Sequence, residues 1–155
     1  MPPKDFYEIL RSSFTEVIPH ARECRMVIER LDETGATAMM PYRREWLGDT
    51  DRGLIHTGII TTLVDTVCGL AALAAAKRFE SIATLDLRMD FLRPAVPDLP
   101  LRARAECYRL TRSISFLRAT AWQQNETEPV AVTQATMMRG QRPGPVSPPV
   151  SPKDA

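Results

Sequence analysis

One segment, residues 57–77, restricts the possible folds of this chain more than any other. Its sequence, TGIITTLVDTVCGLAALAAAK, is apolar on nearly every side when wound as a helix, which is typical of a helix that is buried all around. Such a helix would be roughly 30 Å long, which is also enough to cross a membrane. The segment nevertheless contains Asp65 and four threonines, and an Asp at the centre of a membrane costs about 2.5–3.5 kcal/mol. We therefore expect a central helix buried by protein, and no membrane partner.

The residues after this segment alternate between apolar and polar side chains, as half-exposed antiparallel strands do. In residues 84–92 the side chains expected to face inward are Leu85, Leu87, Met89 and Phe91, whereas Asp86, Arg88 and Asp90 point the other way. Further strands are expected over 101–110, 113–124 and 129–138. Before the central segment, the pattern predicts a helix over 5–18 capped by Asp5 and ended by Pro19, strands over 22–33 and 36–42, and a loop over 43–55. Together these elements predict an α+β fold in which one curved antiparallel sheet wraps around one long central helix.

Length and charge restrict the organisation of the chain and its partners. The 155 residues fit one domain, which we place at residues 1–140. Five of the 13 prolines lie between Pro143 and Pro152, so residues 141–155 are expected to form a Pro-rich flexible tail. Lys and Arg number 20 against 19 Asp and Glu. This balance argues against a nucleic-acid partner, because neutralising phosphates needs a basic surplus.

The cysteines and histidines indicate the compartment and the cofactors. Cys24, Cys68 and Cys107 form no C-x-x-C pair and lie in apolar or alternating runs, which favours a reducing, cytoplasmic location. The first ten residues include acids and no apolar core, so we expect no signal peptide. His20 and His56 fit no metal-binding spacing, and no glycine-rich phosphate motif occurs. We therefore expect neither a metal nor a cofactor.

Asp65 is the residue that needs an explanation, because a carboxylate in an apolar helix must be solvated, paired or protonated. One interpretation is structural, with Asp65 bonded to backbone or to an arginine such as Arg88. The other is functional, with Asp65 lining a cleft as a base or nucleophile. Helical spacing supports the cleft, because it gathers small or polar residues into one stripe opposite a fully apolar side. The stripe consists of Gly58, Thr61, Thr62, Asp65, Gly69 and Ala72, and the apolar side of Ile60, Leu63, Val64, Val67 and Leu70.

The start of the helix, His56-Thr57-Gly58, is the second candidate feature. Thr57 is a suitable N-cap, and the first turn then presents free backbone N–H groups that bind anions or stabilise an oxyanion. Asp65 lies eight residues beyond Thr57, or roughly 12 Å along the helix. One helix therefore cannot bring both groups to the same carbonyl, whereas two antiparallel copies can. The spacing predicts a symmetric homodimer with a shared site.

The run from Leu54 to Asp65, followed by Gly69, resembles the H-G-G-x-x-x-x-L-x-D-x-x-x-G signature of hotdog-fold acyl-CoA thioesterases of the phenylacetate-pathway type. The strand over 84–92, with its Arg93-Pro94-Ala95 exit, resembles the strand that follows the helix in that family. The resemblance covers roughly residues 20–140. It implies a hotdog fold, dimers that often pair into tetramers, and hydrolysis of acyl-CoA without a metal, where CoA is part of the substrate and not a cofactor.

Carried over by position, the resemblance assigns a role to several residues. Asp65 matches the catalytic carboxylate, the backbone N–H at Thr57-Gly58 matches an oxyanion hole supplied by the partner subunit, and Thr84 matches a hydroxyl that orients water. Two departures occur: Thr57 replaces the first glycine, and Thr50 stands where some members carry an Asn in the loop before the histidine.

The remaining candidates carry open alternatives. His56 either takes part in catalysis or fixes the start of the helix. Arg93 either meets the phosphates of CoA or is a solvated surface residue, and Trp46 either lines the acyl pocket or anchors its loop. For the whole chain, the alternative to a thioesterase is a non-catalytic acyl-CoA binding or sensing module on the same fold, and a hotdog dehydratase ranks below both.

Overall fold

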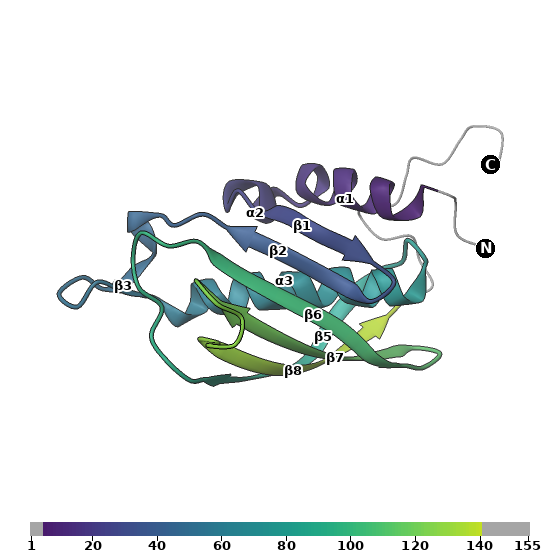
Figure 1. Cartoon of the computed structure of the whole chain (residues 1–155). Helices are drawn as coiled ribbons and strands as arrows, with labels where there is room; N and C mark the ends of the chain where they lie inside the picture. Colours follow the sequence, from purple (N-terminus) through teal and green to yellow (C-terminus); the bar gives the residue numbers. More distant parts are fainter. Residues whose placement is uncertain (1–4, 141–155) are drawn as a thin grey trace.

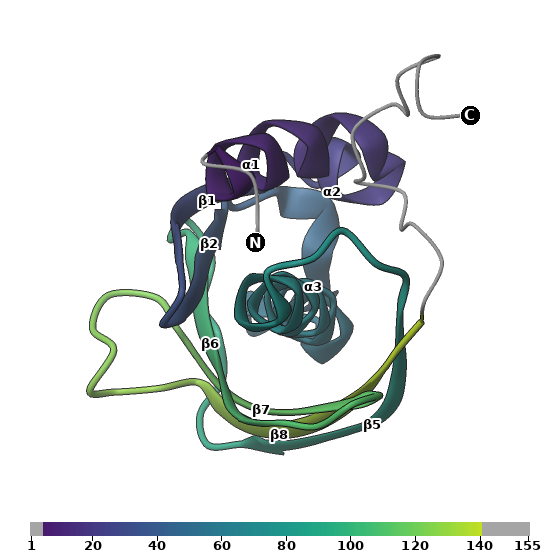
Figure 2. The same ribbon diagram turned by 90° about the vertical axis from the view of Figure 1, so that its right-hand side faces the viewer.

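The long central helix, α3 (Thr57–Ala76), organises the fold, as the computed structural model of residues 5–140 shows. Its N-cap is His56, and it ends at Lys77, which adopts the left-handed conformation. The side chains of Ile60, Leu63, Val64, Val67 and Leu70 are all fully buried, as the sequence predicts. Viewed along its axis, α3 lies inside the curve of the sheet (Figure 2). Residues 1–4 and 141–155, including the expected tail, lie outside the described part.

A six-stranded antiparallel sheet wraps around α3, with the strand order β1-β2-β6-β7-β8-β5 (Figure 1). The strands are β1 (Val27–Asp32), β2 (Gly35–Met40), β5 (Ile82–Phe91), β6 (Leu101–Leu110), β7 (Ile114–Trp122) and β8 (Ala131–Arg139). Two helices, α1 (Phe6–Val17) and α2 (Pro19–Glu23), cover the side of α3 that the sheet leaves open (Figure 2). This is the α+β arrangement of a hotdog fold, and the predicted fold class is confirmed.

Two local predictions are wrong. Pro19 ends α1 but also opens α2, since proline is favoured in the first turn of a helix. The strand expected from residue 22 therefore begins only at Val27. The expected loop over 43–55 contains the 3₁₀ helix η1 (Arg44–Trp46) and a short hairpin of β3 (Leu47–Asp49) and β4 (Leu54–Ile55). Asp5 occupies the N-cap position of α1 without a capping hydrogen bond from its side chain.

Within residues 5–140, α3 is the one helix for which a membrane-spanning role needs to be considered. This helix is long and apolar enough to cross a membrane by length and composition, but 56% of the relevant window is buried inside the protein. Its apolar surface is covered by the sheet and by α1, where Phe6, Leu10 and Phe14 are buried. The hydrophobicity of α3 is accounted for by its place in the core.

Strand β5 departs from the alternation expected of it. Its register with β8 shifts between Thr84 and Asp86, which marks a bulge at Leu85. Leu85, which lies at this bulge, is 55% exposed, and Phe91, at the end of the strand, is 44% exposed. Both were expected to face inward. Leu87 and Met89 do pack against the core. Because β5 is the last strand of the sheet, one of its edges pairs with no strand in residues 5–140.

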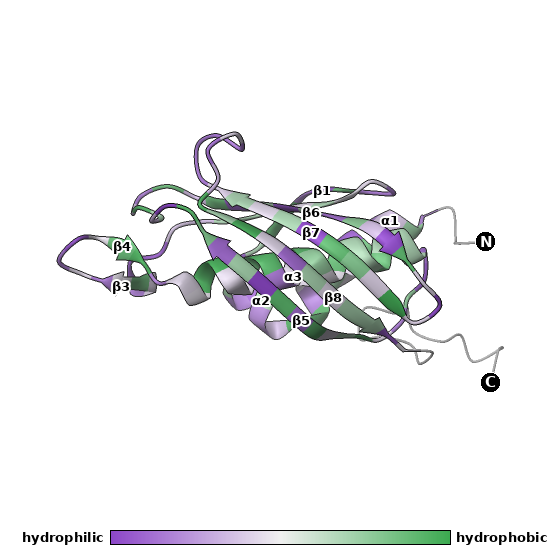
Figure 3. Ribbon diagram, turned by 90° about the horizontal axis from the view of Figure 1, so that it is seen from below, coloured by the Kyte–Doolittle hydropathy of each residue, from purple (hydrophilic) through white to green (hydrophobic). Residues whose placement is uncertain are grey.

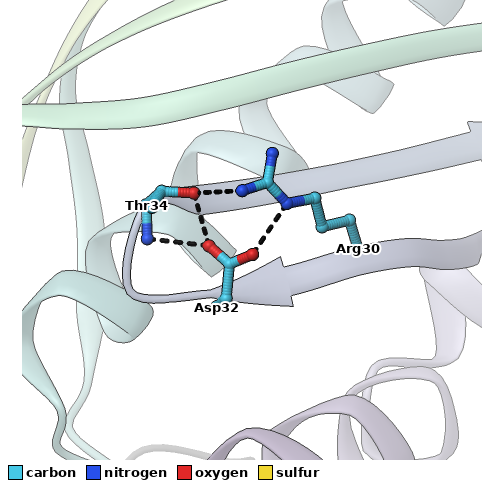
Figure 4. A network of polar contacts seen from close by, with 3 residues as sticks. All are labelled: Arg30, Asp32 and Thr34. Atoms are coloured by element: carbon cyan, nitrogen blue, oxygen red, sulfur yellow. Dashed lines mark hydrogen bonds and ion pairs between the residues drawn. The ribbon is translucent and has the colours of Figure 1, made fainter.

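The turn between β1 and β2 is held by a small polar network (Figure 4). Asp32 accepts hydrogen bonds from the Thr34 hydroxyl and, at 2.8 Å, from the Thr34 backbone N–H, and its other oxygen lies 2.7 Å from Arg30 Nε. The hydrogen bond from the Thr34 hydroxyl lowers the pKa of Asp32 below its usual value, and the Thr34 N–H and Arg30 act in the same direction. The network fixes the turn that leads into Gly35.

Gly35 permits β2 to approach β6 closely. Its φ is +140°, and a Cβ atom there would lie 2.1 Å from the carbonyl oxygen of Ala105. We expect Gly35→Ala to lower the free energy of unfolding by about 2–4 kcal/mol, because backbone strain and overpacking add. Gly53→Ala is the matched control, since Gly53 also has a positive φ (+67°) but its Cβ would lie 3.5 Å from Pro97. Urea denaturation measures both, and equal losses would refute the role of the Ala105 contact.

Candidate active site

Asp65 lies in the middle of α3 and faces strand β5. Its Oδ1 accepts a hydrogen bond of 2.8 Å from the Thr84 hydroxyl, and no residue between 5 and 140 donates to its Oδ2. Arg88, the arginine considered as a structural partner, instead lies 3.5 Å from Asp90. The Asp65 side chain is half-buried. One of its carboxylate oxygens is therefore oriented by Thr84, and the other is free to bind a reactant.

A pocket of about 220 Å³ opens beside Asp65 and Thr84. It lies between α1, α3 and β5, and most of its other wall is apolar. It runs along α3 from Asp65 past Gly69 to Leu73, a rise of about 12 Å. The residues that complete its wall are Phe14, Ile18, Thr66, Glu80, Ile82 and Met137.

The small and polar stripe predicted on α3 is present, with one exception. Gly58, Thr61, Thr62, Asp65 and Gly69 are each partly exposed. A methyl group at Gly69 would meet no atom within 4 Å. Ala72 was expected in the same stripe, but it is fully buried in the core. The stripe therefore leaves α3 uncovered over its first three to four turns and not beyond.

The start of α3 differs from the prediction that Thr57 caps the helix. His56 is the N-cap, and its Nδ1 accepts the Gly58 backbone N–H at 2.9 Å. The imidazole nitrogen accepts the backbone N–H that a threonine hydroxyl accepts in an ordinary N-cap. The Thr57 N–H has no acceptor among residues 5–140, and Thr57 is exposed. The donor that the helix start leaves free for an anion or oxyanion is therefore the Thr57 N–H, while that of Gly58 is engaged.

Thr57 and Arg93 line a second pocket of about 330 Å³. Its other lining is mainly apolar and includes Ile60, Phe91 and Leu92. Arg93 is half-exposed, and its guanidinium lies 3.7 Å from Glu128. Asp65 and Thr84 do not line this pocket, so a single copy of the chain keeps its carboxylate and its free helix N–H in separate pockets.

Thr50 and Trp46 are not brought into either pocket. Thr50 is exposed in the turn of the β3–β4 hairpin, which projects from one end of the molecule (Figures 1 and 3). Trp46 is buried, its ring lies 5.8 Å from the Arg43 guanidinium carbon, and its carbonyl accepts the His56 N–H at 2.8 Å. Trp46 therefore anchors the loop that leads into α3.

Glu80 is a pocket residue that the sequence did not single out. It lies just after α3 and forms an ion pair of 2.7 Å with Arg139, at the end of β8. The two residues are 59 positions apart in sequence, and neither belongs to a motif, so only the register of β5 with β8 brings them together. A larger hollow of about 600 Å³ lies on the outer face of the sheet among charged residues such as Arg88, Glu106 and Arg118, and none of the predicted site residues lines it.

Cys68 follows Asp65 by one turn of α3 and is fully buried. Burial raises the pKa of the Cys68 thiol from its usual 9.0 to about 12, and the charge of Asp65 acts in the same direction. The thiol therefore contributes fully to stability below pH 9, and this contribution is lost as the pH rises toward 12. We expect the destabilising effect of Cys68→Ala, measured by urea denaturation, to shrink by roughly 2–3 kcal/mol between neutral pH and pH 11. A difference that stays constant with pH would contradict this.

A curved antiparallel sheet wrapped around one long helix defines the hotdog fold, and in this chain the helix carries a half-buried carboxylate in its middle. The sequence model of the thioesterase superfamily matches residues 52–130 of this chain. The chain therefore belongs to the thioesterase superfamily. This match does not distinguish subfamilies, so membership in the phenylacetate-pathway type stays a prediction.

Individual relatives agree with this membership. A Halobacterium salinarum protein named as an esterase is 32% identical over 90 residues, which are 57% of this chain and 58% of that protein. The medium/long-chain acyl-CoA thioesterase YigI of Escherichia coli is 25% identical over 125 residues, 72% of this chain and 74% of that protein. A crystal structure of a Pseudomonas aeruginosa protein is 36% identical, with a TM-score of 0.77 over 87% of this chain and 99% of that one.

Proposed function

We propose that this protein hydrolyses acyl-CoA thioesters to a free acid and CoA, at a site that two copies of the chain share. The observation that carries the proposal is Asp65, whose Oδ1 is held by Thr84 while Oδ2 accepts no hydrogen bond from residues 5–140 and lies beside a mainly apolar pocket. Membership in the thioesterase superfamily and the likeness to an acyl-CoA thioesterase support the choice of substrate.

Two routes use the same carboxylate. As a general base, Asp65 removes a proton from water while the water oxygen bonds to the thioester carbon; the carbon–sulfur bond then breaks and the thiolate of CoA takes up the proton. As a nucleophile, Asp65 itself bonds to that carbon and expels the thiolate, and water then hydrolyses the anhydride. In both routes negative charge develops on the carbonyl oxygen, which therefore needs a hydrogen-bond donor.

The Thr57 N–H of a second copy is the donor in this proposal. Within the described residues 5–140, one edge of the ten-residue strand β5 pairs with no other strand, and Leu85, Phe91 and Leu92 are exposed on or next to it. Free apolar edges are normally covered, and a second β5 running antiparallel is the simplest cover. If the two β5 strands pair antiparallel about Leu87, Thr84 of one strand lies opposite Asp90 of the other. The Asp65 pocket of each copy then adjoins the Thr57 pocket of its partner, as the shared site requires.

The pocket of Thr57 and Arg93 accommodates the CoA portion in this arrangement. Its apolar lining suits the pantetheine arm, and Arg93 at its rim suits a phosphate. The ion pair of Arg93 with Glu128 is long and exposed, so it costs little to exchange Glu128 for a phosphate. A tetramer formed from two such dimers stays an expectation.

A panel of acyl-CoA esters with a thiol-trapping reagent tests the proposed function. We expect release of free CoA thiol with at least one ester, and hydrolysis that follows Michaelis kinetics. Tight binding of the same esters with no thiol release would overturn the proposal and favour the acyl-CoA binding or sensing module.

A further inference from the structure

Glu80 places a second carboxylate in the pocket of Asp65. Glu80 is only 9% exposed, although it lies in the connection between α3 and β5, and it lines the pocket together with Leu73 and Ile82. Asp65, about two turns of α3 nearer the start of the helix than Leu73, lines the same pocket together with Thr84 of β5. The pocket therefore has the reacting carboxylate toward one end and Glu80 toward the other.

The bonding of Glu80 is incomplete. Its Oε1 lies 2.7 Å from Arg139 Nε, but the two groups are not aligned as a hydrogen bond. Neither oxygen of Glu80 accepts a hydrogen bond from any residue between 5 and 140. Arg139 donates from Nη2 to the Arg112 carbonyl at 3.2 Å, while its Nη1 is buried without an acceptor. Buried charged groups normally have their hydrogen-bonding capacity filled. Oε1 is enclosed and faces Arg139, so Oε2 is the acceptor that remains for a ligand.

The position of Glu80 discriminates between acyl groups. A purely alkyl chain that filled the pocket would cover the carboxylate without bonding to it, which is unfavourable for a buried charge. An acyl chain that ends in a carboxylate would place its negative charge beside that of Glu80. A hydroxyl group at the far end of the acyl chain instead donates a hydrogen bond to Glu80 and leaves the pair with Arg139 in place.

We propose that the preferred substrate carries a hydroxyl group on its acyl chain, at the end away from the thioester, and that Glu80 recognises it. This rests on the proposed thioesterase function and adds the substrate class. The pocket volume of about 220 Å³ lies below the usual range of ligand cavities, which fits an acyl group alone, with the CoA portion bound elsewhere.

Matched esters test this specificity in the wild-type protein without any mutation. Heptanoyl-CoA and ω-hydroxyhexanoyl-CoA have acyl groups of the same length, and they differ by a terminal methyl in place of a hydroxyl. We expect kcat/KM to be at least about tenfold higher for the hydroxy ester, because hydrogen bonds to charged groups are strong. The CoA monothioester of the corresponding dicarboxylic acid should have the lowest kcat/KM of the three compounds. Equal values for the first two across several chain lengths would overturn the proposal.

A double variant separates recognition by Glu80 from a purely structural role of the ion pair. Glu80→Leu combined with Arg139→Met removes both charges together, since removing one would strand the other in the core. We expect this variant to lose the preference for the hydroxy ester, so that kcat/KM becomes about equal for the two esters. Glu29→Gln with Arg102→Gln is the control, because this 3.1 Å pair lies far from the pocket on β1 and β6, and it should keep the preference. A preference that persists in the pocket variant would overturn the role of Glu80.

Binding measurements keep this inference distinct from the thioesterase proposal. Calorimetry with non-hydrolysable thioether analogues of the same two esters should show the same preference of about tenfold for the hydroxy compound. If no ester is hydrolysed but the hydroxy analogue binds more tightly, the proposed function fails and the recognition by Glu80 stands. If esters are hydrolysed but both analogues bind equally, the proposed function stands and the recognition by Glu80 fails.

Discussion

Asp65→Asn is expected to lower kcat/KM for acyl-CoA hydrolysis by about 10²–10⁴-fold while leaving the fold unchanged. The asparagine is nearly isosteric with aspartate, and its carbonyl oxygen still accepts the Thr84 hydroxyl hydrogen bond that Oδ1 accepts now. The substitution removes the free carboxylate oxygen. The neutral amide group that replaces it neither removes a proton from water nor attacks a thioester carbon. Both proposed routes therefore fail in the same variant.

Asp86→Asn is the matched control for this experiment. Asp86 is an exposed carboxylate on β5, two residues beyond Thr84, and it lines neither pocket. Its substitution should leave kcat/KM within about twofold of the wild type, because surface substitutions have small effects. Thermal unfolding of both variants checks that the fold is retained. A wild-type rate for Asp65→Asn would remove Asp65 from the mechanism and with it the main support for the proposed function.

The sequence was most informative where one local pattern decided the structure. The helix expected over 57–77 is α3, and the strand expected over 101–110 has the bounds of β6. In both segments the hydrophobic residues repeat without interruption, so the pattern is compatible with only one type of secondary structure. Predictions were wrong where two local solutions compete. Pro19 ends one helix as expected but also begins another, so the strand expected from residue 22 starts only at Val27. At Thr57, the histidine before it takes the cap.

Long-range register explains what the sequence could not indicate. The bulge lies at Leu85, next to the Thr84 hydroxyl that bonds to Asp65, and a bulge leaves no mark in a pattern of alternating residues. Glu80 and Arg139 meet only because β5 pairs with β8. The expected stripe on α3 and the carboxylate within it needed only helical spacing, so that part of the candidate site was accessible from sequence alone.

Mixing two inactive variants tests whether the site is shared between subunits. Thr57→Pro deletes the one free N–H at the start of α3, and proline is well tolerated at the first position of a helix. The preceding residue, His56, already has the extended backbone (φ −62°, ψ 130°) that a following proline requires. We expect Thr57→Pro to lower kcat by about 10²–10³-fold, as the loss of an oxyanion donor does, whereas Thr57→Ala, which keeps the N–H, should remain close to wild type.

An equal mixture of Asp65→Asn and Thr57→Pro subunits should regain activity that neither variant has alone. In a heterodimer, one site combines both defects, while the other combines an intact Asp65 with an intact Thr57 N–H from the opposite subunit. Random exchange makes about half of the dimers mixed, with one working site of two, so activity should rise to about one quarter of the wild-type value. Differently tagged subunits establish that exchange has occurred. If exchanged mixtures stay as inactive as the parents, Asp65 and the Thr57 N–H do not act across the interface. The roughly 12 Å that separates them along a single helix would then leave the oxyanion without the donor proposed for it.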